Sequence, residues 1–597
     1  MADLKLRLLP YLARHRRALL GGLACVALTD LISLTQPQVL RHAVDDLYRG
    51  VTAEKLGRYA LILFGIAVVA GVFKYGMRIF VIGVSRRAEF DLRNDLFAHL
   101  ERLPVAYFQR QRTGDIMSRA TNDLAAVRTM LGPGLMYFVN TVVTALASLG
   151  FMLATSPRLT ALALIPLPFV SITVWHFGDR IHRRFEEIQA LFSSLSARAQ
   201  ENLAGVRVVR AFAREDQEID EFRALNCEYL DRNLRLIHTS GLFYPTLGFL
   251  SGLAALIVLY LGGREVVAGR ITLGQFVAFT VYIGMLNWPM VALGWVINMF
   301  QRGLASWGRI VEVLDAPPAA GEAVAAAGRT LARGATAPAE RARGELEFRR
   351  LSFAYPGAAP ESNEAPLALR EVSFRVPAGR TVALVGRTGS GKSTLLALLA
   401  RIFEPPRGTV FRDGVDVRDL DLHWLRAQLA VAPQDAFLFS TTVAANIAYG
   451  VPREERAAVE RAARVAHLEE DVRAFPKGYD TMVGERGITL SGGQRQRTAI
   501  ARAVLRDAPV LALDDCLSSV DTHTEEAVLH RLRAEMAGRT TLLVSHRVST
   551  VRDADEIVVL DEGAVAERGT HEELLALGGL YAALHRRQQL EEELEAS

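Results

Sequence analysis

Cysteine is scarce in this chain of 597 residues, which contains only Cys25, Cys227 and Cys516. Their positions are unrelated and show no metal-ligand spacing, so the sequence predicts neither a disulfide framework nor a cysteine metal cluster. Lysine is also scarce: there are five lysines, and arginine carries nearly all of the positive charge. Together with the abundant alanine, this bias indicates a GC-rich bacterial source.

A basic surface with interleaved aromatic residues is also missing, although the formal net charge is +4. Nucleic-acid-binding proteins concentrate their positive charge in such patches. We therefore expect no nucleic-acid partner. A membrane protein with arginine-rich cytoplasmic loops has the same charge balance.

Long apolar runs account for a hydrophobic content of 50%. Each run has about twenty residues or more, which is long enough to cross a hydrocarbon core of about 30 Å. The sequence therefore predicts six membrane helices in the first half of the chain. The runs are Ala18–Leu40, Tyr59–Ser85, Gly132–Thr155, Leu159–Phe177, Gly241–Gly262 and Ile271–Phe300.

Charge predicts the orientation of these helices. The long connections Arg86–Met130 and Asp179–Thr239 are rich in arginine, whereas the other connections are short. Because arginine-rich loops stay in the cytoplasm, we expect a multi-pass protein of the bacterial cytoplasmic membrane with both termini and the second half of the chain inside. The basic segment before the first run could also indicate a signal peptide, but the run is too long for one. We interpret Leu4–Leu20 as an interfacial helix.

A phosphate-binding pattern, G-x-x-x-x-G-K-[ST], lies in the second half of the chain. It follows the apolar strand-like run Thr381–Val385 and precedes a predicted helix over Lys392–Phe403, which is the context that the pattern needs. Its glycines let backbone N–H groups converge on phosphate oxygens, while the lysine adds positive charge and the serine a hydroxyl for Mg²⁺. The pattern comprises Gly386, Arg387, Thr388, Gly389, Ser390, Gly391, Lys392, Ser393 and Thr394.

Composition divides the chain into three parts. Residues 1–315 form the predicted transmembrane domain, 316–343 an Ala-, Gly- and Pro-rich linker, and 344–597 a nucleotide-binding domain. The last part alternates strand-like and helical stretches, as α/β folds do. Its predicted strands include Leu346–Phe353, Val510–Asp514 and Thr540–Val544. The acidic tail Arg586–Ser597 is interpreted as a solvated helix end, with a dimer contact as the alternative.

The long cytoplasmic connections should continue the membrane helices, because segments such as Ile188–Ala211 are apolar-periodic and lack proline. Their turns, around Arg112–Asp115 and Ala204–Val206, are candidates for contact with the ATPase domain. Ordinary helix hairpins without such a role are the alternative.

Further motifs give the chain a family resemblance. It resembles an ATP-binding-cassette exporter half-transporter, and the resemblance covers nearly the whole chain. This implies an all-α six-helix transmembrane domain fused to an α/β P-loop ATPase domain that binds ATP and Mg²⁺. The motifs, besides the phosphate loop, are Tyr355 in Phe-Ala-Tyr-Pro, Gln434 in Val-Ala-Pro-Gln-Asp, Val483–Gly487, the signature Leu490–Gln494, Asp514 at the end of an apolar strand, Ser518–Asp521 and His546 in Val-Ser-His-Arg.

The resemblance also implies roles for single residues. Tyr355 would stack on adenine, Lys392 would hold the β- and γ-phosphates, and His546 would contact the γ-phosphate. Ser393, Gln434 and Asp514 would organise Mg²⁺, and Asp515, His546 and Gln434 would form the catalytic set. The signature residues would act on a nucleotide held by a facing ATPase domain, so that one chain supplies halves of two sites. They are Ser491, Gly492, Gly493 and Gln494.

Asp515 departs from the family pattern, which has a glutamate here to position the attacking water. Its carboxylate is one methylene shorter, and a displacement of about 1 Å at such a site can cost on the order of 10²-fold in rate. We interpret this as a weak site in one subunit of a heterodimer, whose partner carries the glutamate. A tolerated substitution that still hydrolyses ATP is the alternative.

The substrate path is less defined by sequence. Asp30 lies near the middle of the first span, and Lys74 and Arg78 lie in the second; such groups usually face a cavity or a partner. Asp30 is a candidate for substrate contact or for an interhelical polar contact. In the sixth span, residues that could line an amphipathic path or serve as anchors and packing are Tyr282, Asn287, Trp288 and Trp295.

These features predict ATP-driven export of amphipathic drugs, peptides or lipids. The alternative is a homodimeric lipid flippase or multidrug exporter with two equivalent slow sites. A membrane-anchored ATPase would not need six spans, an ATP-gated channel would show conductance, and importers usually have separate membrane and ATPase chains. The sequence does not name the substrate.

Overall fold

The computed structural model describes residues 7–50, 52–319, 343–356, 366–484, 487 and 489–596. The chain forms two compact units. One comprises Met1–Leu100 and Thr113–Ala316, and the other comprises Glu101–Arg112 and Pro317–Ser597. The linker predicted over 316–343 lies almost entirely outside the described residues.

The first unit is helical. Among the described residues, six helical stretches are long and apolar enough to cross a membrane, which confirms the prediction of six spans. Five stretches contain a whole predicted run, and the sixth begins two residues after the start of its run, at Leu273. The stretches have 33 to 53 residues, whereas about 20 residues cross a bilayer, so the helices continue beyond it. They are Arg16–Tyr48, Ala53–Leu100, Thr113–Thr155, Pro157–Ala204, Glu215–Val267 and Leu273–Leu314.

Several of these stretches contain short π-helical turns, labelled η, where one α-helix passes into the next. The elements of the first unit are α2 (Leu9–Ala13), α3 (Arg16–Ser33), α4 (Gln36–Tyr48), α5 (Ala53–Met77), η1 (Arg78–Ile82), α6 (Gly83–Leu100), α8 (Thr113–Ser118), η2 (Arg119–Asp123), α9 (Leu124–Thr129), η3 (Met130–Gly134), α10 (Leu135–Thr155), α11 (Pro157–Ala163), α12 (Pro166–Ala204), α13 (Val206–Ala211), α14 (Glu215–Ile257), η4 (Val258–Gly262), α15 (Gly263–Val267) and α16 (Leu273–Leu314).

Local signals in the sequence set the helix ends. Thr272 begins α16 with a capping box: its hydroxyl accepts from the Gln275 N–H at 3.1 Å, and the Gln275 side chain accepts from the Thr272 N–H at 2.8 Å. Proline occupies the first turn of α4, α11 and α12, where a missing N–H costs nothing. The long helices are therefore bounded by residues that favour helix starts.

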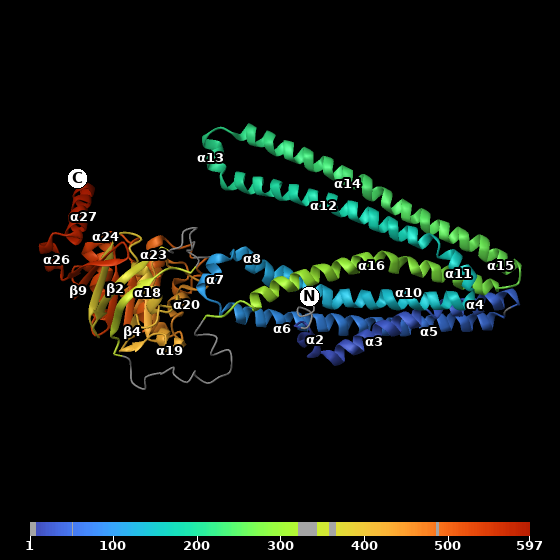
Figure 1. The fold of residues 1–597 in the computed structure, drawn as a ribbon, viewed down its shortest axis with the longest axis horizontal. Helices are drawn as coiled ribbons and strands as arrows, with labels where there is room; N and C mark the ends of the chain where they lie inside the picture. Colours follow the sequence, from blue (N-terminus) through green and yellow to red (C-terminus); the bar gives the residue numbers. More distant parts are fainter. Residues whose placement is uncertain are drawn as a thin grey trace. The chain divides into compact units, whose positions relative to one another are not determined.

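The helices α12 and α14 form a long hairpin, drawn in green in Figure 1. Its tip is the short helix α13. The helix predicted over Ile188–Ala211 is interrupted at Gly205, whose N–H donates to the Glu201 carbonyl at the end of α12. Three large apolar side chains near the tip, Leu203, Val208 and Phe212, are exposed.

The second unit is built on two sheets. In the described residues, a four-stranded antiparallel sheet has the order β2-β1-β4-β5, and a six-stranded sheet has the order β10-β9-β3-β8-β7-β6. The larger sheet is parallel except for β10. The strands are β1 (Leu346–Phe353), β2 (Leu369–Val376), β3 (Thr381–Gly386), β4 (Val410–Arg412), β5 (Val415–Asp416), β6 (Leu429–Ala432), β7 (Val510–Asp514), β8 (Thr540–Val544), β9 (Glu556–Asp561) and β10 (Ala564–Gly569).

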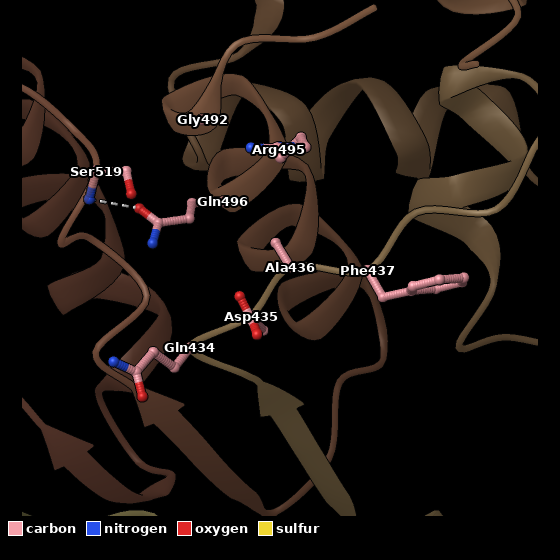
Figure 2. Close-up of a pocket in the computed structure, with 8 residues that line it drawn as sticks. All are labelled: Gln434, Asp435, Ala436, Phe437, Gly492, Arg495, Gln496 and Ser519. Carbon is pink, nitrogen blue, oxygen red and sulfur yellow. Dashed lines mark hydrogen bonds between the residues drawn. The ribbon is translucent and has the colours of Figure 1, made fainter. Parts of the chain in front are cut away.

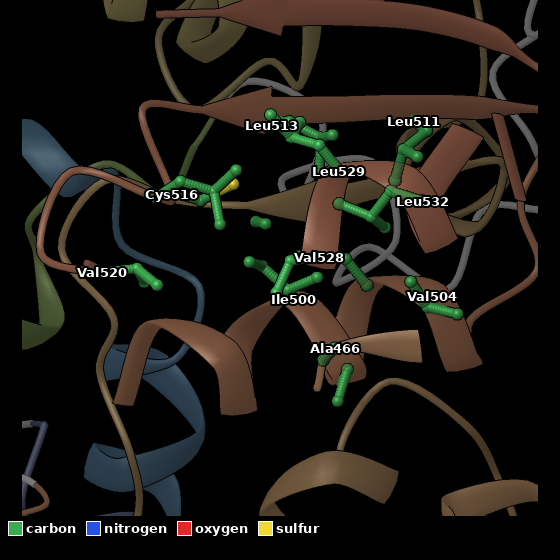
Figure 3. Packing of buried hydrophobic residues seen from close by; sticks show 14 of the residues in the cluster. Ala466, Ile500, Val504, Leu511, Leu513, Cys516, Val520, Val528, Leu529 and Leu532 are labelled. Carbon is green, nitrogen blue, oxygen red and sulfur yellow. The ribbon is translucent and has the colours of Figure 1, made fainter. Parts of the chain in front are cut away.

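Both faces of the larger sheet are buried, which explains why its strands read as continuous apolar runs. On β7, Leu511 and Leu513 belong to one apolar cluster, and Val510 and Ala512 belong to another. Figure 3 shows the first cluster, where Leu511 and Leu513 of β7 meet Leu532 and its neighbours on a helix below the sheet. The buried core thus fixes the carboxyl ends of these strands. Gly386 lies at the end of β3, and Asp514 lies at the end of β7.

Helices surround these sheets. One of them corrects a prediction: the helix expected over Lys392–Phe403 ends at Leu399. Arg401 has a left-handed backbone, with φ of 47°, and its buried guanidinium donates to the carbonyls of Val417 and Leu420, which turns the chain away. The helices are α7 (Val105–Arg110), α18 (Lys392–Leu399), α19 (Leu422–Ala427), α20 (Val443–Ala448), α21 (Arg456–Val465), α22 (Glu469–Ala474), η5 (Gly478–Asp480, 3₁₀), α23 (Gly492–Leu505), α24 (Thr522–Met536), α25 (Val548–Val551), α26 (His571–Leu577) and α27 (Leu580–Ala596).

The helix α7 comes from the first long connection but belongs to the second unit. Ala106 packs against the apolar cluster that contains Phe353 and Leu395. The turn predicted to make this contact, Arg112–Asp115, mostly lies in the first unit, as the start of α8. Ala106, upstream of the predicted turn, thus packs against the ATPase core, and contact by the turn itself stays a prediction.

Candidate nucleotide-binding site

The phosphate loop connects β3 to α18 and depends on two of its glycines. Gly386 has φ of 153°, and a Cβ there would lie 2.1 Å from the Leu560 carbonyl oxygen. Gly391 has φ of 98°, and its Cβ would lie 2.6 Å from the Leu369 side chain. Only glycine fits both the space and the backbone conformation, so the chain can wrap tightly before the helix N-terminus.

Lys392 is held by the loop that it follows. Its ammonium group donates to the carbonyls of Gly386 and Arg387 at 2.9 and 2.8 Å and lies 3.4 Å from the Ser390 hydroxyl. Burial lowers its pKa from the usual value, while Asp515 and Asp514 act in the opposite direction. The arrangement places a fixed positive charge inside the loop, as phosphate binding requires.

A cavity of about 320 Å³ opens beside the loop. Small-molecule sites usually have volumes of roughly 300–1,000 Å³. The structure brings most of the predicted nucleotide and catalytic residues together here, from segments far apart in sequence. The lining comprises Tyr355, Ala368, Thr388, Gly389, Gly391, Lys392, Ser393, Thr394, Gln434, Asp514, Asp515, Val544 and His546.

The three residues predicted to organise Mg²⁺ all line this cavity. The Ser393 hydroxyl donates to Asp514 Oδ1 at 3.0 Å, and Gln434 lines the same space. Burial raises the pKa of Asp514, against the opposing effects of the Ser393 hydrogen bond and Lys392. A hydroxyl, a carboxylate and an amide oxygen are hard donors of the kind that Mg²⁺ prefers, so the residues present fit this ion.

Asp515 and His546 form a pair at the edge of the cavity. His546 Nδ1 lies 2.9 Å from Asp515 Oδ1. This hydrogen bond is the main reason why the pKa of His546 is raised above its usual value, with burial acting against it. Asp515 has a left-handed backbone with φ of 43°, a conformation that aspartate adopts more readily than most residues. The short carboxylate is thus directed toward the histidine.

Tyr355 lies over the start of α18. Its hydroxyl is 2.8 Å from the Thr394 hydroxyl, and its ring meets Phe353 and Phe403 edge-on at 5.3 and 5.1 Å. The ring also lines the cavity. Stacking on adenine stays a prediction for this residue.

The signature residues do not line the nucleotide cavity of their own chain. Ser491 instead begins α23, where its hydroxyl accepts from the Gln494 N–H at 3.2 Å and the Gln494 side chain accepts from the Ser491 N–H at 3.0 Å. Gly492 lines a second cavity of about 380 Å³ together with Gln434 (Figure 2). A Cβ on Gly493 would lie 3.2 Å from the Ser519 carbonyl oxygen. The signature therefore packs closely against the loop that follows β7.

Gln496 is a residue that sequence reasoning missed. Its side chain accepts from the Ser519 N–H at 2.8 Å, as Figure 2 shows, and donates to the Ser518 hydroxyl at 3.0 Å. It is buried and ties α23 to the segment after β7. No local pattern marks it, since its partners lie more than 20 residues away in sequence.

In the first unit, the structure places Asp30 and Tyr282 in contacts between helices. Asp30 is buried and accepts a hydrogen bond from Asn140 on α10, which is an interhelical contact. Tyr282 is 1% exposed, and its hydroxyl donates to the Leu34 carbonyl. Both side chains are therefore buried between helices, and their contact with substrate stays a prediction, whereas Lys74 and Arg78 are exposed.

A cavity of about 390 Å³ in the first unit lies between the third and sixth membrane stretches. Trp295, one of the predicted path residues, lines it. Trp288 is exposed elsewhere on α16, and the side chain of Asn287, like Glu485 and Arg486 of the Val483–Gly487 motif, lies outside the described parts. The full lining is Asn122, Ala125, Ala126, Thr129, Trp295, Asn298, Met299 and Arg302.

Known proteins are similar to this chain over most of its length. Residues 19–290 match the family model of the ABC transporter transmembrane region, and residues 369–518 match the ABC transporter model. YheI of Bacillus subtilis, a probable multidrug resistance ABC transporter ATP-binding/permease protein, is 38% identical over 94% of this chain and 93% of its own. The multidrug resistance-like ATP-binding protein MdlA of Escherichia coli is 37% identical over 98% and 96%.

Two further comparisons extend this picture. An ATP-dependent lipid A-core flippase of Aromatoleum aromaticum is 39% identical over 89% of this chain and 85% of its own. The solved structure of a bacterial Atm1-family ABC exporter with ATP bound superposes with a TM-score of 0.76 and 29% identity, covering 96% of this chain and 98% of that one. The likeness thus includes both the helical unit and the sheet-containing unit.

Proposed function

Because this chain belongs to the ABC transporter family and has the exporter fold, we propose that it exports amphipathic substrates as one half of a heterodimer. It is an ATPase coupled to transport and a multi-pass protein of the bacterial inner membrane. The observation that carries the proposal is Asp515, paired with His546, where the family pattern has glutamate. We further propose cytoplasmic termini, the domain limits 1–315 and 344–597, and the site residues named above.

In this proposal the chain's own cavity binds ATP firmly. The phosphate loop and Lys392 hold the phosphates, and Ser393, Gln434 and Asp514 hold Mg²⁺, which when bound neutralises charge on the phosphate oxygens. Tyr355 supplies an aromatic face for the base. The side chains named here and most of the loop line one cavity, so the groups that would bind ATP are already close together.

Hydrolysis in the same cavity should be slow. Asp515 orients the attacking water from a carboxylate one methylene shorter than glutamate, and that carboxylate is engaged by His546 at 2.9 Å. Phosphoryl transfer depends mainly on positioning and electrostatics, so a misplaced carboxylate loses much of its effect. The signature is intact, and its Ser491 and Gly493 would complete a faster site whose phosphate loop belongs to the partner.

A partner is also favoured by the hairpin of α12 and α14. Leu203, Val208 and Phe212 near its tip are 76%, 60% and 75% exposed, in a segment predicted to lie in the cytoplasm. Lipid cannot cover apolar side chains outside the bilayer, and such exposed groups mark protein contacts. We propose that the tip packs against the ATPase domain of the second half-transporter.

The substrate class follows from the cavity between the third and sixth membrane stretches. Trp295 and Met299 offer apolar surface, Asn122 and Asn298 offer hydrogen bonds, and Arg302 is the charged residue of the lining. Such a wall suits an amphipathic molecule, and the arginine favours an anionic group. The relatives include a probable multidrug resistance transporter and a lipid A-core flippase.

The test compares two variants in the full complex of this chain with the second half-transporter that the proposal requires. Lys392→Ala removes the phosphate lysine of this chain's own site, and Ser491→Ala removes the signature serine of the site proposed for the partner. Lys477→Ala, an exposed lysine of the same domain, serves as the control. ATP hydrolysis and substrate accumulation in inverted vesicles are measured together.

The heterodimer predicts that Ser491→Ala abolishes turnover while Lys392→Ala leaves a measurable part of it. Equal loss from both variants, with the chain active when purified alone, would instead establish the homodimeric exporter or flippase with two equivalent slow sites. ATP-dependent conductance without uphill accumulation would overturn export itself.

A further inference from the structure

The C-terminal helix α27 is firmly docked on the ATPase core. The Glu567 carboxylate accepts hydrogen bonds from the N–H groups of Leu580 and Tyr581 at the start of the helix. Tyr581 is fully buried, and its hydroxyl lies 2.7 Å from His571 Nδ1. Leu584 lies about one turn later and packs against the apolar cluster that contains Tyr581 and Leu513. This docked face continues at helical spacing to Gln588.

Gln588 contacts the loop that carries His546. Its side-chain amide donates to the His546 carbonyl at 2.5 Å, and its side-chain oxygen accepts from the Val548 N–H at 2.7 Å. One side chain thus bridges the backbone on both sides of Arg547. Few single residues can hold a loop in this way, because the contact needs a donor and an acceptor on one rigid amide.

The Gln588 contact satisfies a backbone N–H group at the start of the short helix α25. Val548 begins the short helix α25, and its N-cap residue Arg547 makes no side-chain cap. An uncapped first turn leaves N–H groups without partners, and a side-chain oxygen commonly satisfies them. Here that oxygen comes from another helix. The Arg547 side chain is itself engaged, with Glu525, so the loop is held from two sides and only the His546 imidazole points to the nucleotide cavity.

We propose that Gln588 is a positioning residue for His546, which makes the C-terminal helix part of the nucleotide site. The inference rests on the proposed role of His546 as the contact of the γ-phosphate. By fixing the backbone on each side of Arg547, Gln588 sets where the imidazole meets ATP. ADP lacks the γ-phosphate, so its binding does not depend on this contact.

The test measures how strongly the full chain in lipid nanodiscs binds fluorescent ATP and fluorescent ADP, with Mg²⁺. Gln588→Leu removes both hydrogen bonds at similar size, and Gln588→Glu keeps the acceptor for Val548 but loses the donor for His546. Gln589→Leu, an exposed neighbour on the same helix, is the control. The melting temperature of each variant is recorded in parallel.

We expect Gln588→Leu to weaken ATP binding about tenfold and to leave ADP binding within about twofold, since one charge-assisted hydrogen bond is at stake. Gln588→Glu should have an intermediate effect, and Gln589→Leu none. In addition, Gln588→Leu combined with His546→Ala should bind ATP no more weakly than His546→Ala alone, because both act through one group.

Equal changes in ATP and ADP affinity, or an additive double variant, would overturn the positioning role and leave Gln588 as a purely structural contact. If His546→Ala itself leaves ATP affinity unchanged, the proposed role of His546 fails, and this inference fails with it. The ratio of ATP affinity to ADP affinity does not depend on how many fast sites the transporter has. The heterodimer proposal can therefore fail without affecting this result.

Discussion

Lengthening Asp515 to glutamate should convert the weak site into a fast one. In the structure, Asp515 directs its carboxylate to His546 Nδ1 at 2.9 Å. Glutamate adds one methylene, which moves the carboxylate outward by roughly the length of a carbon–carbon bond. Because the phosphate loop, Ser393 and Asp514 already line the cavity, we expect the longer carboxylate alone to give fast hydrolysis.

The substitution has two effects, one on the barrier of hydrolysis and one on folding stability. Misplacing a catalytic group by about 1 Å can cost on the order of 10²-fold in rate, or about 2.7 kcal/mol of barrier. Separately, Asp515 has φ of 43°, and a left-handed backbone costs roughly 1–2 kcal/mol for an ordinary residue but less for aspartate. That second effect lowers folding stability and leaves the barrier alone. We therefore expect turnover to rise about 10²-fold while the melting temperature falls by a few degrees.

The assay is Mg²⁺-ATP hydrolysis by the full complex in nanodiscs, with the partner's phosphate-loop lysine replaced so that only this chain's cavity turns over. Asp515→Asn, which keeps the length of the side chain and removes its charge, is the control and should be slower than wild type. A rise of less than about twofold for Asp515→Glu would refute the reasoning, because the short carboxylate would then not limit the rate.

Three further outcomes are expected. Arg302→Ala should reduce transport of anionic amphiphiles about tenfold and that of cationic ones little, as measured by uptake into inverted vesicles; equal losses would count against recognition. Leu532→Ala, at a fully buried position, should cost about 2–5 kcal/mol and lower the melting temperature of the ATPase domain, whereas exposed Leu590→Ala should not. The Asp515 hydrogen bond raises the pKa of His546. This pair should therefore stabilise the fold below about pH 6.5 and lose that effect as pH rises through the folded-state pKa, so that the melting-temperature difference from Asp515→Asn shrinks toward alkaline pH. A constant difference would show that the pair does not titrate.

Local patterns allowed much of the architecture to be predicted. The apolar runs gave the six spans because a bilayer demands about twenty apolar residues in sequence. The strands around Gly386 and Asp514 were predictable because parallel strands are buried on both faces. The phosphate loop was predictable because its glycines are required by local backbone geometry, such as the φ of 98° at Gly391.

Contacts between distant segments could not be predicted in this way. The sequence gives no sign that Ala106 packs in the ATPase unit, that Gln496 holds Ser519, or that Gln588 holds the His546 loop. Each depends on which surfaces meet after folding. The end of α18 was also mispredicted, because Leu399 is followed by an apolar stretch and the turn comes from the long-range hydrogen bonds of Arg401.

The geometry of Ser491 supports the proposal that the signature acts on the nucleotide of a partner chain. The serine hydroxyl accepts from the Gln494 N–H and so caps α23, but a hydroxyl has one O–H donor besides its two acceptor positions. The cap therefore leaves the donor available, at the N-terminus of a 14-residue helix whose dipole favours an anion. The nucleotide cavity of the same chain does not include Ser491 in its wall. In the proposed dimer, a phosphate that uses this donor would belong to the nucleotide of the partner chain, and Gly492 and Gly493 leave no side chain in its way.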